Sequence, residues 1–83
     1  MLQTGAETFR VHFGDGEVVE AHLATSTRRA LAPGRPPLQV AEEIVRMGLE
    51  TGSWPTGVDG PVDLGHVAGR TPTGVEELRH RLG

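Results

Sequence analysis

The sequence predicts an α+β fold. Residues 8–24 alternate apolar and polar side chains on either side of a Gly-Asp-Gly turn, a pattern typical of an antiparallel hairpin. Residues 38–51 instead repeat their apolar side chains with the helical period. A chain of 83 residues has the size of one ordinary domain, so residues 1–83 are expected to fold as a single small unit.

The N-terminal hairpin is predicted to join strands of about residues 8–13 and 17–24. A three-residue loop at 14–16 pairs residues whose numbers sum to 30, and this register keeps the apolar side chains of both strands on one face. It also places Arg10 opposite Glu20 on the polar face, where opposite charges form a favourable cross-strand pair.

Three segments are expected to lack regular structure. Residues 1–6, at the N-terminus, are expected to be flexible. Residues 25–37 are expected to form a loop with room for one helical turn after Ser26, because Pro and Gly stop a longer helix there. Residues 52–61 are dense in Gly, Pro, Ser and Asp and are expected to form a second loop.

The central helix is predicted over about residues 38–51, with Gly52 as the residue that ends it. Its polar side chains fall within about 100° of arc, whereas its apolar side chains cover roughly 200°. A one-sided surface helix needs about half of that apolar arc. The hairpin covers one flank, so another element or a partner is expected to cover the other.

The C-terminal part contains one weak and one strong signal. Residues 62–67 are a candidate for a short third strand, which Gly65 interrupts. Thr73 to Glu76 match a capping box, and a helix is predicted over about residues 74–82. A helix this short does not persist alone, so it is expected to dock on the second apolar flank of helix 38–51.

The residue types that the chain lacks exclude several chemistries. It contains no Cys and no Lys, which rules out a disulfide scaffold, a thiolate metal site, a Cys nucleophile and a Lys Schiff base. Ser26 as a nucleophile would need a base and an oxyanion hole that the pattern does not supply. The chain is therefore expected to be non-catalytic and to need no cofactor. The joint absence of Lys, Asn and Tyr is typical of a GC-rich bacterial genome, which makes arginine the default positive charge.

The charge balance and hydropathy bear on location. A net charge of −3 argues against general attraction to nucleic acid or to an anionic membrane. No apolar run approaches the roughly 18 residues of a membrane span, and no signal-peptide pattern opens the chain. A cytoplasmic protein without a membrane partner is expected.

Two groups of polar residues are weak candidates for a ligand site. Asp59, Asp63 and His66 supply oxygen and imidazole donors, but their spacing matches neither a calcium loop nor a zinc signature. Aspartate in such Gly/Pro-rich segments normally serves turns, so no metal site is predicted. His12 and His22 lie on the polar face of the hairpin, where they are expected to be ordinary solvated residues.

The stretch from residue 21 to residue 41 is positive and free of acids, and it contains Arg28, Arg29 and Arg35. These arginines are candidates for contact with a phosphate or a nucleic-acid backbone. No aromatic side chain nearby is free to stack on bases, so a solvated loop is the competing interpretation. Trp54 either plugs the edge of the core or anchors a partner, and so small a core favours the plug.

The sequence favours a small non-catalytic protein-interaction or regulatory module. Its partner would be another protein or a second copy of the chain, bound at the apolar flank of helix 38–51 or at a sheet edge. The residues expected to make this contact are Trp54, Val40, Ile44 and Met47. The alternative is a small nucleic-acid-binding regulator that uses Arg28, Arg29 and Arg35.

Overall fold

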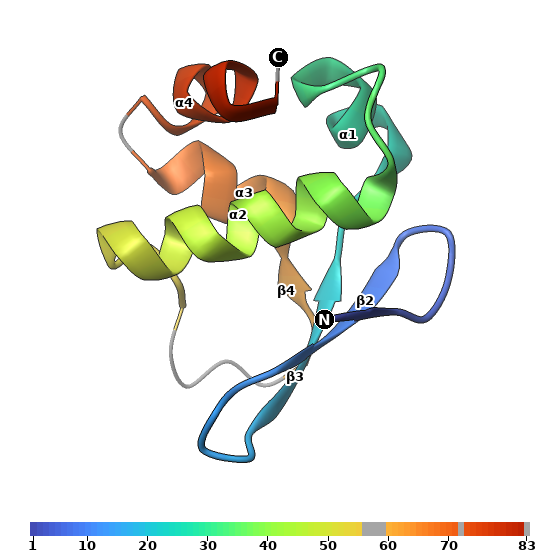
Figure 1. Ribbon diagram of the computed structural model, residues 1–83, viewed down its shortest axis with the longest axis vertical. Helices are drawn as coiled ribbons and strands as arrows, with labels where there is room; N and C mark the ends of the chain where they lie inside the picture. The colour runs from blue at the N-terminus through green and yellow to red at the C-terminus, as the bar shows by residue number, and fades with distance from the viewer. Residues whose placement is uncertain (56–59, 72, 83) are drawn as a thin grey trace.

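The computed structural model describes residues 1–55, 60–71 and 73–82. The strands form one four-stranded sheet in the order β1-β2-β3-β4, and the helices form a second layer beside it (Figure 1). The pairs β1–β2 and β2–β3 are antiparallel, whereas β3 and β4 are parallel. The predicted α+β fold is confirmed. In chain order the elements are β1 (Leu2–Gln3), β2 (Thr8–His12), β3 (Val18–His22), α1 (Thr25–Leu31), α2 (Pro37–Thr51), β4 (Val62–Asp63), α3 (Leu64–Arg70) and α4 (Gly74–Leu82).

The hairpin between β2 and β3 has the predicted register. Phe9 pairs with Ala21 and Val11 with Val19, so the residue numbers of each pair sum to 30. The turn contains Gly16 in a left-handed conformation with a φ of 90°, which glycine adopts without steric cost. On the opposite face, Arg10 Nε lies 3.0 Å from Glu20 Oε1 as expected.

The N-terminal residues add a short edge strand to the hairpin. Leu2 pairs with Arg10 and Gln3 with Phe9, which makes β1 the edge next to β2. Flexibility of residues 1–6 stays a prediction, because the pairing describes their position and not their motion.

Residues 25–37 are predicted to form a loop with room for one helical turn after Ser26, and in the structure this place is taken by the seven-residue helix α1, which begins at Thr25. Two tertiary contacts stabilise this short helix. The Glu7 carboxylate accepts a hydrogen bond from the Thr25 N–H, and the Leu31 side chain is buried in the core. A helix of this length does not persist on local propensity alone, so its formation depends on these contacts.

The candidate strand over residues 62–67 was correct only for its first two residues. Val62 pairs with Ala21, and Asp63 then begins α3 by accepting hydrogen bonds from the N–H groups of Gly65 and His66. This is the side-chain capping that aspartate performs at a helix start. The chain therefore turns from strand to helix at Asp63, and the buried Leu64, Val67 and Ala68 follow a helical period.

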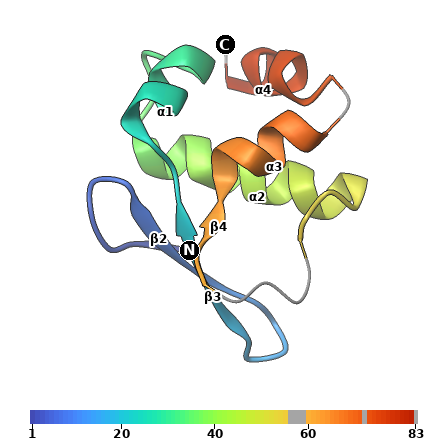
Figure 2. The ribbon, with the colours of Figure 1, turned by 180° about the vertical axis from the view of Figure 1, so that it is seen from behind.

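Helix α2 is covered on two sides, as its wide apolar arc predicts. Figure 1 shows it crossing between the sheet and α4, and Figure 2 shows α3 alongside it. It packs against both α3 and α4. Its C-terminus is Gly52 in the left-handed conformation, with a φ of 73°, also as predicted.

Helix α4 has the predicted bounds and docks as expected. Leu78 and Leu82 are buried, and Val75 packs against the edge of the core. Thr73, just before the helix, has a φ of 56°, which differs from the extended backbone of a capping-box residue. The second apolar flank of α2 is thus covered within the chain.

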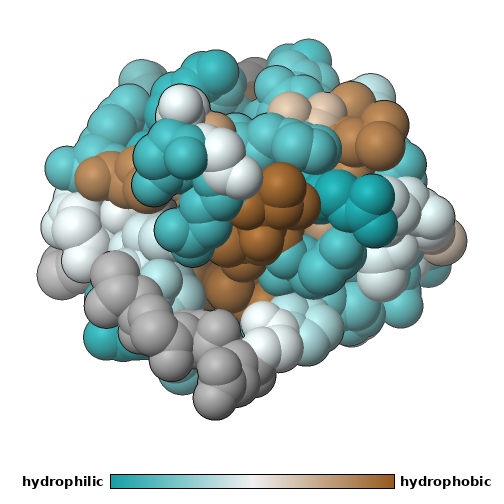
Figure 3. Space-filling view, turned by 90° about the horizontal axis from the view of Figure 1, so that it is seen from below, coloured by the Kyte–Doolittle hydropathy of each residue, from teal (hydrophilic) through white to brown (hydrophobic). Residues whose placement is uncertain are grey.

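The surface carries few large apolar side chains. Leu2, Val18 and Leu49 are about half exposed. The face seen in Figure 3 has an apolar area at its centre that polar side chains border. Among the described residues, the structure contains no helix with the length and apolar character needed to cross a bilayer.

Candidate functional site

Two neighbouring cavities lie in the helical layer, and the C-terminal end of α1 contributes to the lining of both. The first, here called the loop cavity, has a volume of about 420 Å³ and is lined by residues 30–35 with Arg79 and Leu82. The second, the helix cavity, has about 380 Å³ and lies between α1, α3 and α4. Both are open to solvent and not enclosed, with volumes in the range of ligand pockets. The residues that line the helix cavity are Ser26, Thr27, Ala30, Leu31, Gly65, Ala68, Gly69, Val75 and Arg79.

The two cavities share Ala30, Leu31 and Arg79, and together they are called the α1 groove. Three hydrogen bonds from arginine side chains to backbone carbonyls hold its walls together. Arg28 Nη1 donates to the Arg35 oxygen at 3.2 Å, and Arg35 Nε donates to the Leu82 oxygen at 2.6 Å. Arg79 Nη2 donates to the Ala30 oxygen at 3.4 Å. These bonds join α1, the loop after it and α4.

The floor of the α1 groove is apolar. Leu31, Ala32 and Leu82 line the loop cavity and are at least nine-tenths buried, and Ala68 does the same in the helix cavity. The helix cavity is open at Gly69, where an added Cβ would meet nothing within 4 Å, whereas Gly65 is packed against the Thr27 side chain. The groove therefore presents an apolar surface with arginine at its rim.

Arg35 and Arg79, which line the groove, and Arg28, which bonds to the Arg35 oxygen, have no acidic partner in the described part of the chain. There, the arginine ion pairs involve Arg10, Arg46 and Arg81. Arg28, Arg35 and Arg79 bond to neutral carbonyls instead. Since the whole chain carries a net charge of −3, this local excess of positive charge is a property of the groove and not of the protein at large.

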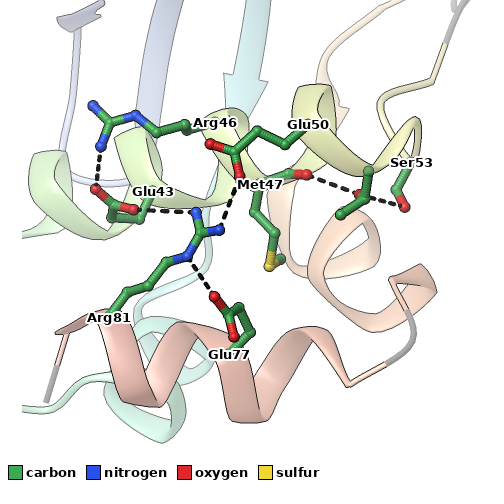
Figure 4. Close-up of polar contacts among 8 residues, drawn as sticks. Glu43, Arg46, Met47, Glu50, Ser53, Glu77 and Arg81 are labelled. Carbon is green, nitrogen blue, oxygen red and sulfur yellow. Dashed lines mark hydrogen bonds and ion pairs between the residues drawn. The ribbon is translucent and has the colours of Figure 1, made fainter.

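Arg81, which lies on α4 like Arg79, is by contrast an arginine whose positive charge is paired with glutamates. Its guanidinium reaches from α4 between two glutamates of α2, as Figure 4 shows. It lies 2.9 Å from Glu50, 2.9 Å from Glu77 and 3.6 Å from Glu43. The hydrogen bonds to Glu50 and Glu77 raise the pKa of Arg81 above its ordinary value. Arg81 is thus a structural link between α2 and α4.

The structure brings together part of the predicted arginine group. Arg28 and Arg35 meet through a hydrogen bond, and Arg29 is exposed on α1. Arg79 was missed by sequence reasoning, although it lies beside the apolar stripe of helix 74–82. The stripe shows that this helix docks, but only the tertiary structure shows that Arg79 then points to α1.

Three of the four predicted contact residues are not on the surface. Val40, Ile44 and Met47 are at most 1% exposed and belong to the core. Trp54 is half-buried and meets the Phe13 ring edge-on, with ring centroids 6.0 Å apart. Trp54 is therefore positioned at the edge of the core, next to Gly48 of α2.

Two of the three weak metal candidates, Asp63 and His66, lie in the described structure. Asp63 caps α3, His66 is exposed, and Asp59 lies outside the described residues. The described residues contain no group of three or more His, Asp or Glu side chains placed to hold a metal ion.

The two hairpin histidines lie on the side of the sheet away from α2. His12 is exposed, and His22 Nε2 lies 3.6 Å from Glu7 Oε1. Neither histidine lines the α1 groove. The groove is thus distinct from the polar face of the hairpin.

The chain was compared with known proteins at the level of families, curated sequences and solved structures. No family model matches it, and neither a curated protein nor a solved structure does. The chemistry of the α1 groove therefore follows from its own side chains.

Proposed function

We propose that the chain is a non-catalytic protein-interaction or regulatory module that binds a segment of a partner protein in the α1 groove. The observation that supports this is the meeting of an apolar floor with arginines that have no acidic partner among the described residues. Protein segments combine apolar side chains with hydrogen-bonding and charged groups, which is what such a surface recognises.

Nucleic acid is the alternative occupant, through Arg28, Arg29 and Arg35. The side chains that line the two cavities include no aromatic residue on which a base could stack. The buried apolar floor also offers little to a phosphate backbone, whose binding is dominated by charge. These two features favour a protein segment.

A second copy of the chain is the simplest protein partner. The apolar flank of α2 is covered by α3 and α4, so self-association would use the groove or a sheet edge. Both edge strands, β1 and β4, are two residues long, which limits how many ladder hydrogen bonds a copy can add. The groove is therefore the favoured surface in this form of the proposal as well.

The test is a selection of peptides from a random displayed library, followed by substitutions that fill the groove. Gly34 lines the loop cavity and Gly69 the helix cavity, and a Cβ added at either meets nothing within 4 Å. Gly34→Leu and Gly69→Leu therefore each add a bulky side chain at the lining of one cavity without a clash at Cβ. Gly14→Leu is the matched control, because Gly14 is equally open and lies in the hairpin turn.

We expect selected peptides to bind the wild type and Gly14→Leu equally and to lose binding to Gly34→Leu or Gly69→Leu. The proposal is rejected if every selected peptide binds the groove-filled variants as well as the wild type. The nucleic-acid alternative would be supported instead if the chain bound a single-stranded or duplex oligonucleotide in a salt-sensitive way. That binding should be lost in the Arg28→Ala/Arg29→Ala double variant. If light scattering shows only monomer at high protein concentration, a second copy of the chain is excluded as the partner.

A further inference from the structure

Arg79 stands at the boundary between the two cavities of the α1 groove. Its side chain lines both of them, together with Ala30 and Leu31. The hydrogen bond from Arg79 Nη2 to the Ala30 oxygen crosses from α4 to α1 at this boundary. The groove is thus divided by one exposed arginine side chain that is held by a single carbonyl.

That hydrogen bond is easily replaced. At 3.4 Å it is longer than the usual 2.9–3.0 Å of an N–H to oxygen bond, and its acceptor is neutral. A carboxylate accepts from guanidinium through a shorter bond that is roughly twice as strong. An acidic group that reaches the boundary would therefore compete successfully with the Ala30 carbonyl.

We propose, building on the proposed function, that the occupant is a peptide segment with an aspartate or glutamate between apolar residues. Its carboxylate takes the place of the Ala30 oxygen as the acceptor for Arg79. The apolar side chains on either side of the acid enter the loop cavity and the helix cavity, where Leu31 forms a shared wall.

Charge complementarity selects this occupant over a neutral segment. Arg35 lines the loop cavity, which Arg79 also lines, and Arg28 bonds to the Arg35 oxygen. Two further positive charges therefore lie at or beside the loop cavity. No described carboxylate forms an ion pair with Arg28, Arg35 or Arg79. An acidic segment supplies negative charge that no described side chain places there.

The experiment uses two displayed peptide libraries, one with all residue types and one without Asp and Glu. Groove-dependent binders, defined by their loss in Gly34→Leu or Gly69→Leu, are expected from the first library only. Replacing the acidic residue of a selected peptide by its amide should weaken binding by about tenfold or more, the size expected when a charge-assisted hydrogen bond is lost.

A charge swap at Arg79 tests the direct contact. Arg79→Glu should reject the acidic peptide and bind the same peptide with arginine in place of the acid, a rescue that a misfolded variant would not show. Arg10→Gln, which removes one positive charge on the far face of the sheet, should leave binding unchanged.

The outcomes separate the two proposals. Groove-dependent binders that come equally from the acid-free library would overturn the acidic occupant and leave the proposed function intact. Acidic binders that Arg79→Glu still accepts would also overturn the acidic occupant. The lack of any groove-dependent binder in either library would reject the proposed function itself.

Discussion

The Glu7 carboxylate accepts a hydrogen bond from the Thr25 N–H at 2.5 Å and thereby caps α1 from the position just before β2. Ala24, at the N-cap position, provides no side-chain bond of its own. The bond from Thr25 lowers the pKa of the Glu7 carboxyl below its ordinary value, and the neighbouring His22 lowers it further. One carboxylate therefore links the hairpin to the helix that forms the wall of the groove.

This link predicts a pH-dependent stability. The folded-state pKa of Glu7 lies below its unfolded-state value of about 4.5, so the carboxylate stabilises the folded chain above that pH. The contribution disappears as the pH falls through the folded-state pKa. Glu7→Gln should therefore lower the thermal midpoint at about pH 7, and the difference from wild type should shrink towards about pH 3.

The control is Glu42→Gln, which removes a carboxylate from the exposed face of α2. It reports the effect of losing one negative charge alone. A Glu7→Gln variant whose thermal midpoint equals that of wild type across the whole pH range would contradict the capping role.

Arg81 is expected to hold α4 against α2. Its side chain is only 25% exposed and contacts three glutamates, two of them on α2. Arg81→Gln should lower the thermal midpoint, and Arg81→Lys should do so less, because lysine keeps the charge but not the planar fork. The loss should diminish at about 1 M salt, where exposed charges are screened.

Arg46→Gln is the comparison for Arg81, since Arg46 is 59% exposed and, among the described residues, pairs with Glu43 alone. Exposed single pairs contribute little, so its effect should be the smaller one. Equal midpoints for Arg46→Gln and Arg81→Gln would argue against a special role of Arg81.

Gly74 and Gly69 form a matched pair of glycine positions. A Cβ at Gly74 would lie 2.7 Å from the Ala68 oxygen and 2.8 Å from the Thr71 Cβ, so Gly74→Ala should destabilise the fold by about 1–3 kcal/mol. A Cβ at Gly69 meets nothing within 4 Å, and Gly69→Ala should stabilise α3 by about 0.5–1 kcal/mol. Urea unfolding measures both, and a Gly74→Ala variant as stable as wild type would refute the close packing of α4 against the end of α3.

Ile44 is fully buried between the sheet and the other helices. Ile44→Ala should cost about 2–5 kcal/mol of unfolding free energy, measured by urea denaturation, because it leaves a cavity in the core. Leu49→Ala, at a half-exposed position of the same helix, should change stability by about 0.5 kcal/mol or less. If Ile44→Ala kept full stability but changed the mass in solution, Ile44 would be a contact residue after all.

Local sequence patterns predicted the elements in which the alternation of apolar and polar residues repeats over many positions. The parity of the apolar residues fixed the pairing of Val11 with Val19, because a shift by one residue would turn every side chain to the wrong face. The wide apolar arc of residues 38–51 likewise required two covering layers, and α4 supplied part of the second.

The short elements could not be predicted in the same way. Helix α1 depends on the Glu7 carboxylate, 18 residues earlier in the chain, and α3 depends on a strand pairing that brings Asp63 beside β3. A segment of seven residues carries too little local preference to choose between helix, strand and loop.

By itself, the sequence determined the hairpin register, the central helix, the terminal helix and an acid-free run of arginines. Only the tertiary structure decided that Val40 and Ile44 face inward and that Arg79 joins Arg35 at the α1 groove. Periodicity sets which face of an element is apolar, whereas the partner of that face depends on contacts between residues far apart in the chain.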